Sequence, residues 1–224
     1  MHKPLRITRI EAVPLFGESP KGGWSAEIRP QDSIHALIAV HTDDGITGHG
    51  SVFTDGRLVQ AALPVLEPLF LGEDALAPER VSEKLHQNTF WMGRGGTLTH
   101  TISGIDIALW DIIGKACNQP IHKLIGGAFR TKVQAYATGF YFSDMNRVTE
   151  EAVEEAHEYL DSGFRAVKMK IGLGDLRKDI ARVAAVRQAI GPDVLLMVDS
   201  NHCYNVPQAI TIGRELEKLG VHWF

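Results

Sequence analysis

The stretch AVKMKIGLGDLRKDIARVAAVRQAIGPDVLLMVD, residues 166–199, decides the fold. Residues 166–171 form a short apolar run that contains two lysines, which is typical of a strand. Residues 175–190 have helical periodicity, and Gly191-Pro192 ends the helix. Residues 195–199 are again an apolar run. The stretch therefore predicts a strand–helix–strand unit whose two strands lie parallel in one sheet.

The same alternation extends on both sides of this stretch. A strand is predicted at 132–138 and a helix at 148–161 before it, and a helix at 207–219 and a new strand from Val221 after it. Alternation at about 30 residues per unit predicts a parallel sheet, either in a barrel or in a doubly wound fold. Residues 131–224 therefore supply three βα units and the start of a fourth strand.

Residues 1–130 follow a different pattern and predict an α+β domain. Asp43-Asp44-Gly45 separates two alternating runs, which is a strong hairpin signal. Residues 17–33 hold three Gly and two Pro without periodicity and predict a long mobile loop. The predicted helices are 57–70, 78–90 and 97–116. We place the domain boundary near Arg130.

Composition excludes several classes of protein. Lys and Arg total 23 against 27 Asp and Glu, a net charge of −4, and no basic stripe points to nucleic acid. The apolar runs are far shorter than the ~20 residues of a membrane span, and nothing predicts a membrane partner. Two cysteines cannot form a disulfide framework. We expect a soluble, cytoplasmic protein.

Lys168 and Lys170 are the first candidates for chemistry. Alternate strand residues point to opposite faces, so both lysines share one face and Val167 and Met169 share the other. In a barrel the lysines would face the interior, where two neighbouring ammonium groups disfavour each other's charge. One lysine could then act as a base near neutral pH. The alternative is a pair of lysines that reaches water at a strand end.

Asp199 and Asn201 are the second candidates. They follow an apolar strand, where a buried carboxylate is costly unless it is paired or holds a metal. Their oxygens suit Mg²⁺ better than zinc. The alternative is that Asp199 caps the following helix. A third motif, Gly172-Leu173-Gly174, lacks the third glycine of a dinucleotide fingerprint and is weak evidence for a cofactor.

Several motifs in order carry a family likeness. They are SGIDIALWDIIGK at 103–115, the segment from Pro120 to Gly127, Lys168-x-Lys170 and VDSN at 198–201. Together they resemble the mandelate racemase and muconate-lactonising branch of the enolase superfamily, over essentially the whole chain. AYATG at 135–139 and AIGPD at 189–193 are most similar to the acid-sugar enzymes of that branch.

The resemblance implies an α+β N-terminal capping domain followed by a TIM-type (β/α) barrel. It implies Mg²⁺ held by three carboxylates, of which Asp199 is similar to the first. Lys170 would be the base that removes the proton α to the carboxylate of a sugar acid or lactone, and Lys168 would contact that carboxylate.

The resemblance also implies further substrate contacts and an assembly state. Asn201 would touch substrate beside the metal. In the loop 17–33, Trp24 is a candidate substrate contact, and Tyr141 after the first barrel strand is another. Family members are usually multimeric, so we expect a homo-oligomer.

The sequence departs from the family at its end, because Phe224 falls where the family continues into further strands and ligands. We therefore expect an incomplete barrel, the sequence of a truncated chain or of part of a longer enzyme, and a 224-residue polypeptide that is inactive by itself. Two alternatives remain open. One is a racemase or cycloisomerase of another carboxylate, and the other is a catalytically inert assembly protein on the same scaffold.

Overall fold

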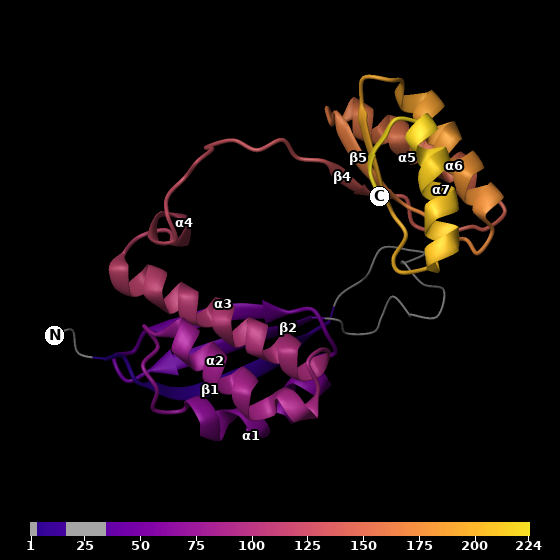
Figure 1. The fold of residues 1–224 in the computed structure, drawn as a ribbon. Coiled ribbons are helices and arrows are strands. Elements are labelled where there is room, and N and C mark those ends of the chain that lie inside the picture. Colours follow the sequence, from indigo (N-terminus) through magenta and orange to yellow (C-terminus); the bar gives the residue numbers. More distant parts are fainter. Residues whose placement is uncertain (1–3, 17–34) are drawn as a thin grey trace. The chain divides into compact units, whose positions relative to one another are not determined.

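The computed structural model describes residues 4–16 and 35–224, which form two compact units (Figure 1). Unit 1 comprises the described residues up to 131, and unit 2 comprises 132–224. The predicted loop 17–33, with Trp24, lies outside the described residues. In the part of the chain that is described, no helix has both the length and the hydropathy to cross a bilayer.

Unit 1 is built on a three-stranded antiparallel sheet, in the order β1 (Ile7–Leu15), β2 (His35–Thr42), β3 (Thr47–Val52). The predicted hairpin between β2 and β3 is confirmed. Gly45 adopts a φ of +81°, which its missing Cβ allows, and its amide donates to the Thr42 carbonyl at 3.2 Å. Alternate residues of β2, namely Ala36, Ile38 and Val40, are fully buried.

Helices cover this sheet and supply the rest of its core. They are α1 (Gly56–Phe70), α2 (Pro78–Thr89), α3 (Thr97–Cys117) and the short α4 (Ile121–Leu124), with a 3-10 turn η1 (Phe90–Met92) after α2. The predicted helix 97–116 is confirmed as α3. Its apolar face, which includes Ile105, Ala108, Leu109 and Ile112, is fully or almost fully buried against the sheet.

Strand β3 approaches α3 closely because both elements carry glycine at the contact. A Cβ at Gly50 would overlap the Gly104 carbonyl oxygen and lie 3.0 Å from its carbonyl carbon. A Cβ at Gly48 would lie 2.6 Å from Cγ1 of Ile112. A Cβ at Gly104 would collide in turn with Val52 and Ile38. Backbone therefore packs against backbone here, which side chains larger than hydrogen would prevent.

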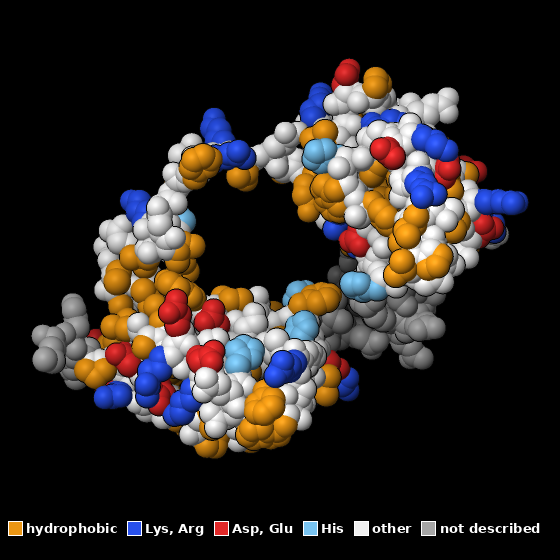
Figure 2. All heavy atoms as spheres, viewed as in Figure 1, with side chains coloured by type: hydrophobic (Ala, Val, Ile, Leu, Met, Phe, Trp, Pro, Cys, Tyr) orange, Lys and Arg blue, Asp and Glu red, His pale blue; other side chains and the backbone are white. Residues whose placement is uncertain are grey.

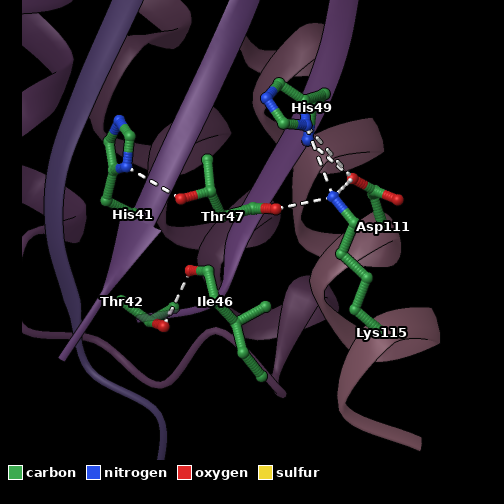
Figure 3. A network of polar contacts seen from close by, with 7 residues as sticks. All are labelled: His41, Thr42, Ile46, Thr47, His49, Asp111 and Lys115. Atoms are coloured by element: carbon green, nitrogen blue, oxygen red, sulfur yellow. Dashed lines mark hydrogen bonds and ion pairs between the residues drawn. The ribbon is translucent and has the colours of Figure 1, made fainter. Parts of the chain in front are cut away.

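Polar contacts fasten the far end of α3 to β3 (Figure 3). The Asp111 carboxylate accepts from the His49 amide at 2.8 Å and from Lys115 Nζ at 2.6 Å. Lys115 Nζ also donates to the Thr47 carbonyl at 2.6 Å. Partial burial alone would raise the pKa of Asp111, but the hydrogen bonds from Lys115 and the His49 amide outweigh it, so this pKa is lowered.

Unit 2 alternates strands and helices along the chain. Its elements are β4 (Ala137–Gly139), α5 (Val148–Asp161), β5 (Ala166–Lys170), α6 (Leu176–Ile190), β6 (Leu195–Asp199), α7 (Val206–Lys218) and β7 (Val221–Trp223). The strands form one parallel sheet in the order β4-β5-β6-β7. This is the arrangement expected for the first strands of a (β/α) barrel.

The predicted strand at 132–138 is wrong in extent, because only 137–139 form β4. Ala137 pairs with Val167, the second residue of β5. Residues before 136 would extend past the start of the partner strand, so they have no ladder in which to hydrogen-bond. Residues 132–136 are accordingly exposed.

The two faces of this sheet differ in chemistry. Val167 and Met169 are fully buried in a core with residues of α5, α6 and α7, and the lysines alternate with them along β5. At the edges, the rings of Tyr136 and Trp223 contact edge to face with centroids 6.4 Å apart. Tyr136 precedes β4 and Trp223 ends β7, so this contact joins the two edge strands and the sheet between them is curved.

The surface carries charges of both signs. Figure 2 shows Lys and Arg side chains interspersed with Asp and Glu side chains over the described residues on the face in view. A mixed surface agrees with the small net charge of −4.

Candidate active site

Three charged side chains and one amide meet at the carboxyl ends of β5 and β6. Lys168 Nζ donates to Asp199 Oδ2 at 3.1 Å, and Lys170 Nζ donates to the same oxygen at 2.8 Å. Lys170 Nζ also donates to Asn201 Oδ1 at 2.6 Å. The structure therefore brings together the four residues that the strand ends predicted as a site.

The register of the parallel ladder explains this convergence. Lys168 lies beside Met197 and Lys170 beside Asp199 in the β5–β6 pairing. Because side chains alternate along a strand, these residues point to the face opposite Val167 and Met169. The two lysines therefore share Asp199 as a counterion.

The site is half-buried, and its electrostatics favour the ionised carboxylate. Lys170 is 9% exposed. Burial would raise the pKa of Asp199, but hydrogen bonds from Lys170, from the Asn201 amide and from Lys168 outweigh it and lower this pKa to about 2. Asp199 is therefore an anion at neutral pH, as a metal ligand must be.

The turn after β6 aims Asn201 at Lys170. Asn201 and the next residue, His202, both have positive φ, at +45° and +66°. The Asn201 amide donates to Asp199 Oδ1 at 3.0 Å, a local bond that helps to hold this conformation. Asp199 does not cap the following helix. That role belongs to Asn205, which forms a capping box with Gln208.

The donor set fits part of a Mg²⁺ site. Asp199 and Asn201 offer a carboxylate and an amide oxygen, the hard ligands that Mg²⁺ prefers. Among residues 4–16 and 35–224, no three His, Cys, Asp or Glu side chains gather as a metal cluster. Mg²⁺ keeps several waters and needs several hard ligands, so Asp199 would be one ligand among several and not a complete site.

The Gly172-Leu173-Gly174 motif is not a phosphate cradle in this structure. The amides of Gly172 and Leu173 donate to the buried Asp179 carboxylate at 2.9 Å and 3.1 Å. Tyr204 Oη donates to Asp179 Oδ2 at 2.7 Å. A side chain of the protein thus occupies the N–H groups that a bound anion would need.

Tyr141 and Trp24 are the two remaining predicted substrate contacts. Tyr141 follows Phe140 after β4, and no hydrogen bond or ion pair links it to the four site residues in the described part of the chain. Trp24 lies outside the described residues. Their predicted roles remain predictions.

Two residues behind the site escaped the sequence reasoning. Asp179 and Arg182 of α6 are both fully buried, with an exposed fraction of 0%. The signal was present in the helical periodicity, because both fall in register with the buried Val183, Val186 and Ile190. A charged residue on the buried face of a helix needs partners, and here the partners are strand-end loops.

This chain combines the features of an enolase-superfamily protein. It has a small α+β unit, a parallel βα sheet, and paired lysines beside a carboxylate at the strand ends. Residues 28–126 match the family Mandelate racemase / muconate lactonizing enzyme, N-terminal domain, and residues 151–224 match Enolase C-terminal domain-like. The chain belongs to the mandelate racemase and muconate-lactonizing branch of this superfamily. The predicted fold, a capping domain followed by an incomplete (β/α) barrel, is confirmed.

Two of the similar curated proteins are named as enzymes of acid sugars. The chain is 42% identical to arabinonate dehydratase of Saccharolobus solfataricus, covering 83% of this chain and 50% of that protein. It is 39% identical to D-galactarolactone cycloisomerase of Agrobacterium fabrum, covering 98% and 58%. A racemase structure from Streptomyces coelicolor with bound magnesium matches at a TM-score of 0.80 and 31% identity, covering 97% and 61%. The chain thus spans about half the length of the curated relatives it matches.

Proposed function

We propose that this sequence is that of a Mg²⁺-dependent lyase or isomerase, or of part of one. The enzyme removes the proton α to the carboxylate of a sugar acid or of its lactone. The observation that carries the proposal is the shared contact of Lys168 and Lys170 with Asp199, with Asn201 on the second lysine. The names of similar proteins, a dehydratase and a cycloisomerase of acid sugars, support the substrate class.

Lys170 would take the proton at Nζ. It is the most enclosed of the charged groups, and Asn201 Oδ1 and Asp199 Oδ2 fix the position of its nitrogen. A fixed amine next to the α carbon turns proton transfer into a step within one complex. Lys168, whose side chain is 18% exposed, would bind the substrate carboxylate by charge.

Asp199 would hold Mg²⁺, with Asn201 beside it toward the substrate. The chemistry that Mg²⁺ supplies when bound is stabilisation of the negative charge that develops on the carboxylate oxygens after proton removal. Trp24 and Tyr141 are proposed as further substrate contacts. Whether the intermediate then loses water or closes a ring depends on groups other than these residues.

The test is α-proton exchange. The full polypeptide that carries this sequence is incubated with Mg²⁺ in D₂O and a panel of sugar acids and lactones, and loss of the α-proton signal is followed by NMR together with product formation. Lys170→Met keeps the length of the side chain and removes the amine, so we expect exchange and turnover to fall by at least about 10³-fold with the fold intact. Lys178→Met, an exposed lysine on α6, is the control.

The possible results separate clearly. Exchange that depends on Lys170 and survives in the Lys178→Met variant supports the proposal. Exchange that persists in Lys170→Met, or an absence of exchange across the whole panel, contradicts it. Circular dichroism of each variant verifies that activity is compared between folded proteins.

A further inference from the structure

Two buried charged side chains of helix α6 contact the loops that carry the candidate active site. Asp179 and Arg182 lie one turn apart near the start of the helix, and both have an exposed fraction of 0%. They approach the sheet from its helix-covered face, whereas Lys168 and Lys170 occupy the other face. Neither residue contacts the four site side chains through its own charged group.

Asp179 joins the loop after β5 to the loop after β6. Its carboxylate accepts from the Gly172 and Leu173 amides, which begin two residues after Lys170. It also accepts from Tyr204 Oη, three residues after Asn201. One carboxylate therefore fixes the distance between the chain segments that present the proposed base and the proposed metal ligand.

Arg182 joins the end of β4 to the end of β5. Its guanidinium donates to the Lys170 carbonyl, to the Phe140 carbonyl at 2.8 Å and to the Val148 carbonyl at 3.0 Å. The bond to Lys170 acts directly on the backbone of the proposed base. Burial lowers the pKa of Arg182 to about 10, so the guanidinium remains charged at neutral pH.

The segment at Phe140 is also held in an uncommon conformation. Phe140 is fully buried with a φ of +59°, which a bulky residue rarely adopts. Its amide donates to Glu155 Oε2 at 2.9 Å, and its carbonyl accepts from Arg182. Bonds on both sides of the residue thus impose the backbone direction with which the chain leaves β4.

Burying a guanidinium carries a large desolvation cost, so stability alone does not account for Arg182. Replacing buried charges by apolar side chains of similar volume is often neutral or stabilising. What a guanidinium provides and an apolar side chain lacks is a fork of donors with fixed geometry. Here those donors select carbonyls at the strand ends that carry the candidate active site.

We propose that Asp179 and Arg182 are positioning residues for proton abstraction, acting through the backbone of Lys170 and the loop of Asp199 and Asn201. This inference rests on the function proposed above. It differs from a purely structural role because it predicts a loss in kcat among molecules that remain folded. A displacement of the reacting atoms by about 1 Å is enough for a large loss in rate.

The chain offers a matched control on the same helix. Arg187 also bridges loops through its guanidinium, but at the opposite ends of the strands, where β6 and β7 begin. Its bonds, all at 2.8–2.9 Å, go to the carbonyls of Gly191, Val194, Leu219 and Gly220. Arg182→Lys and Arg187→Lys therefore each remove a guanidinium that bridges loops, from the fully buried Arg182 and from the partly buried Arg187 of the same helix.

The experiment measures kcat, KM and thermal unfolding for both variants in the α-proton assay. We expect both to unfold at lower temperature, but only Arg182→Lys to lose kcat, by at least about tenfold with KM changed less than about twofold. Amide hydrogen exchange at 171–174 should accelerate in Arg182→Lys and not in Arg187→Lys. Tyr204→Phe, which deletes one bond to Asp179, provides a milder variant should Arg182→Lys fail to fold.

Two results would overturn the inference. One is a wild-type kcat in folded Arg182→Lys and Tyr204→Phe, and the other is an equal loss of kcat in Arg187→Lys. Failure of the proposed function has a different signature, because Lys170→Met would then keep its activity or the wild-type protein would lack any. Amide hydrogen exchange at 171–174 reports whether Arg182 holds the loop after β5. This measurement does not depend on enzymatic activity.

Discussion

The close contact between Gly50 and Gly104 predicts that a methyl group added at position 50 will force strand β3 away from helix α3. In Gly50→Ala the new Cβ overlaps the Gly104 carbonyl oxygen and lies 3.0 Å from its carbon and 3.1 Å from the Ala108 nitrogen. All three atoms belong to the backbone of the helix, so no side chain can rotate away. The strand and the helix must separate by about 1 Å before ordinary contact distances return.

The size of the effect follows from what that separation exposes. A gap of this width forfeits a quarter to a half of the dispersion energy of each contact it crosses, and the interface includes fully or nearly fully buried side chains such as Ile105, Leu109 and Ile112. Overpacking usually costs 1–3 kcal/mol, and a collision between two backbones belongs at the upper end. We expect a loss of about 3 kcal/mol, or roughly 10 °C in Tm for unit 1.

The assay is urea unfolding and calorimetry of Gly50→Ala beside Gly95→Ala. A Cβ at Gly95 meets nothing within 4 Å, so that variant should match the wild-type protein or gain a few tenths of a kcal/mol from the unfolded state. A Gly50→Ala protein within about 0.5 kcal/mol of wild type would refute the reasoning. It would mean that the helix and strand can slide apart without losing their packing.

Two further predictions concern polar contacts. Because the folded pKa of Asp111 is lowered, its contribution is present above the unfolded value of about 4 and is lost as pH falls through the folded pKa. Asp111→Asn should therefore cost about 1 kcal/mol at pH 7, and the gap to wild type should narrow at pH 3 in urea titrations; a gap independent of pH would contradict this. Asn205→Ala removes the capping box of α7 and should cost about 1 kcal/mol in the unfolding of unit 2, whereas Ile210→Ala on the exposed side of α7 should cost less.

Periodicity was enough to predict most of the fold. Helix α5 and strand β6 have the predicted bounds, and α7 differs from its prediction by one residue at each end. Each has a regular apolar pattern and a clear stop signal. The strand at 132–138 failed because its extent depends on where a partner strand begins, which a local pattern does not contain.

The site was predictable as far as strand alternation reaches. Lys168, Lys170 and Asp199 follow from one register, and Asn201 from its distance to the strand end. Asp179 and Arg182 were missed because their partners are backbone groups of distant loops, which have no residue type to recognise. The helix cap at Asn205 was also missed, because the capping alternative was considered only for Asp199 at the end of β6.

The contact between Tyr136 and Trp223 makes the fluorescence of unit 2 sensitive to the distance between the two edges of its sheet. All four tyrosines of the chain lie within 132–224, and Trp223 is the one tryptophan of that range. With ring centroids 6.4 Å apart, light absorbed by Tyr136 should pass to Trp223 and emerge as indole fluorescence. If the edges of the sheet draw apart, the donor regains its own emission. A change that separates the two edges of the sheet can therefore be followed in the native sequence, without a label.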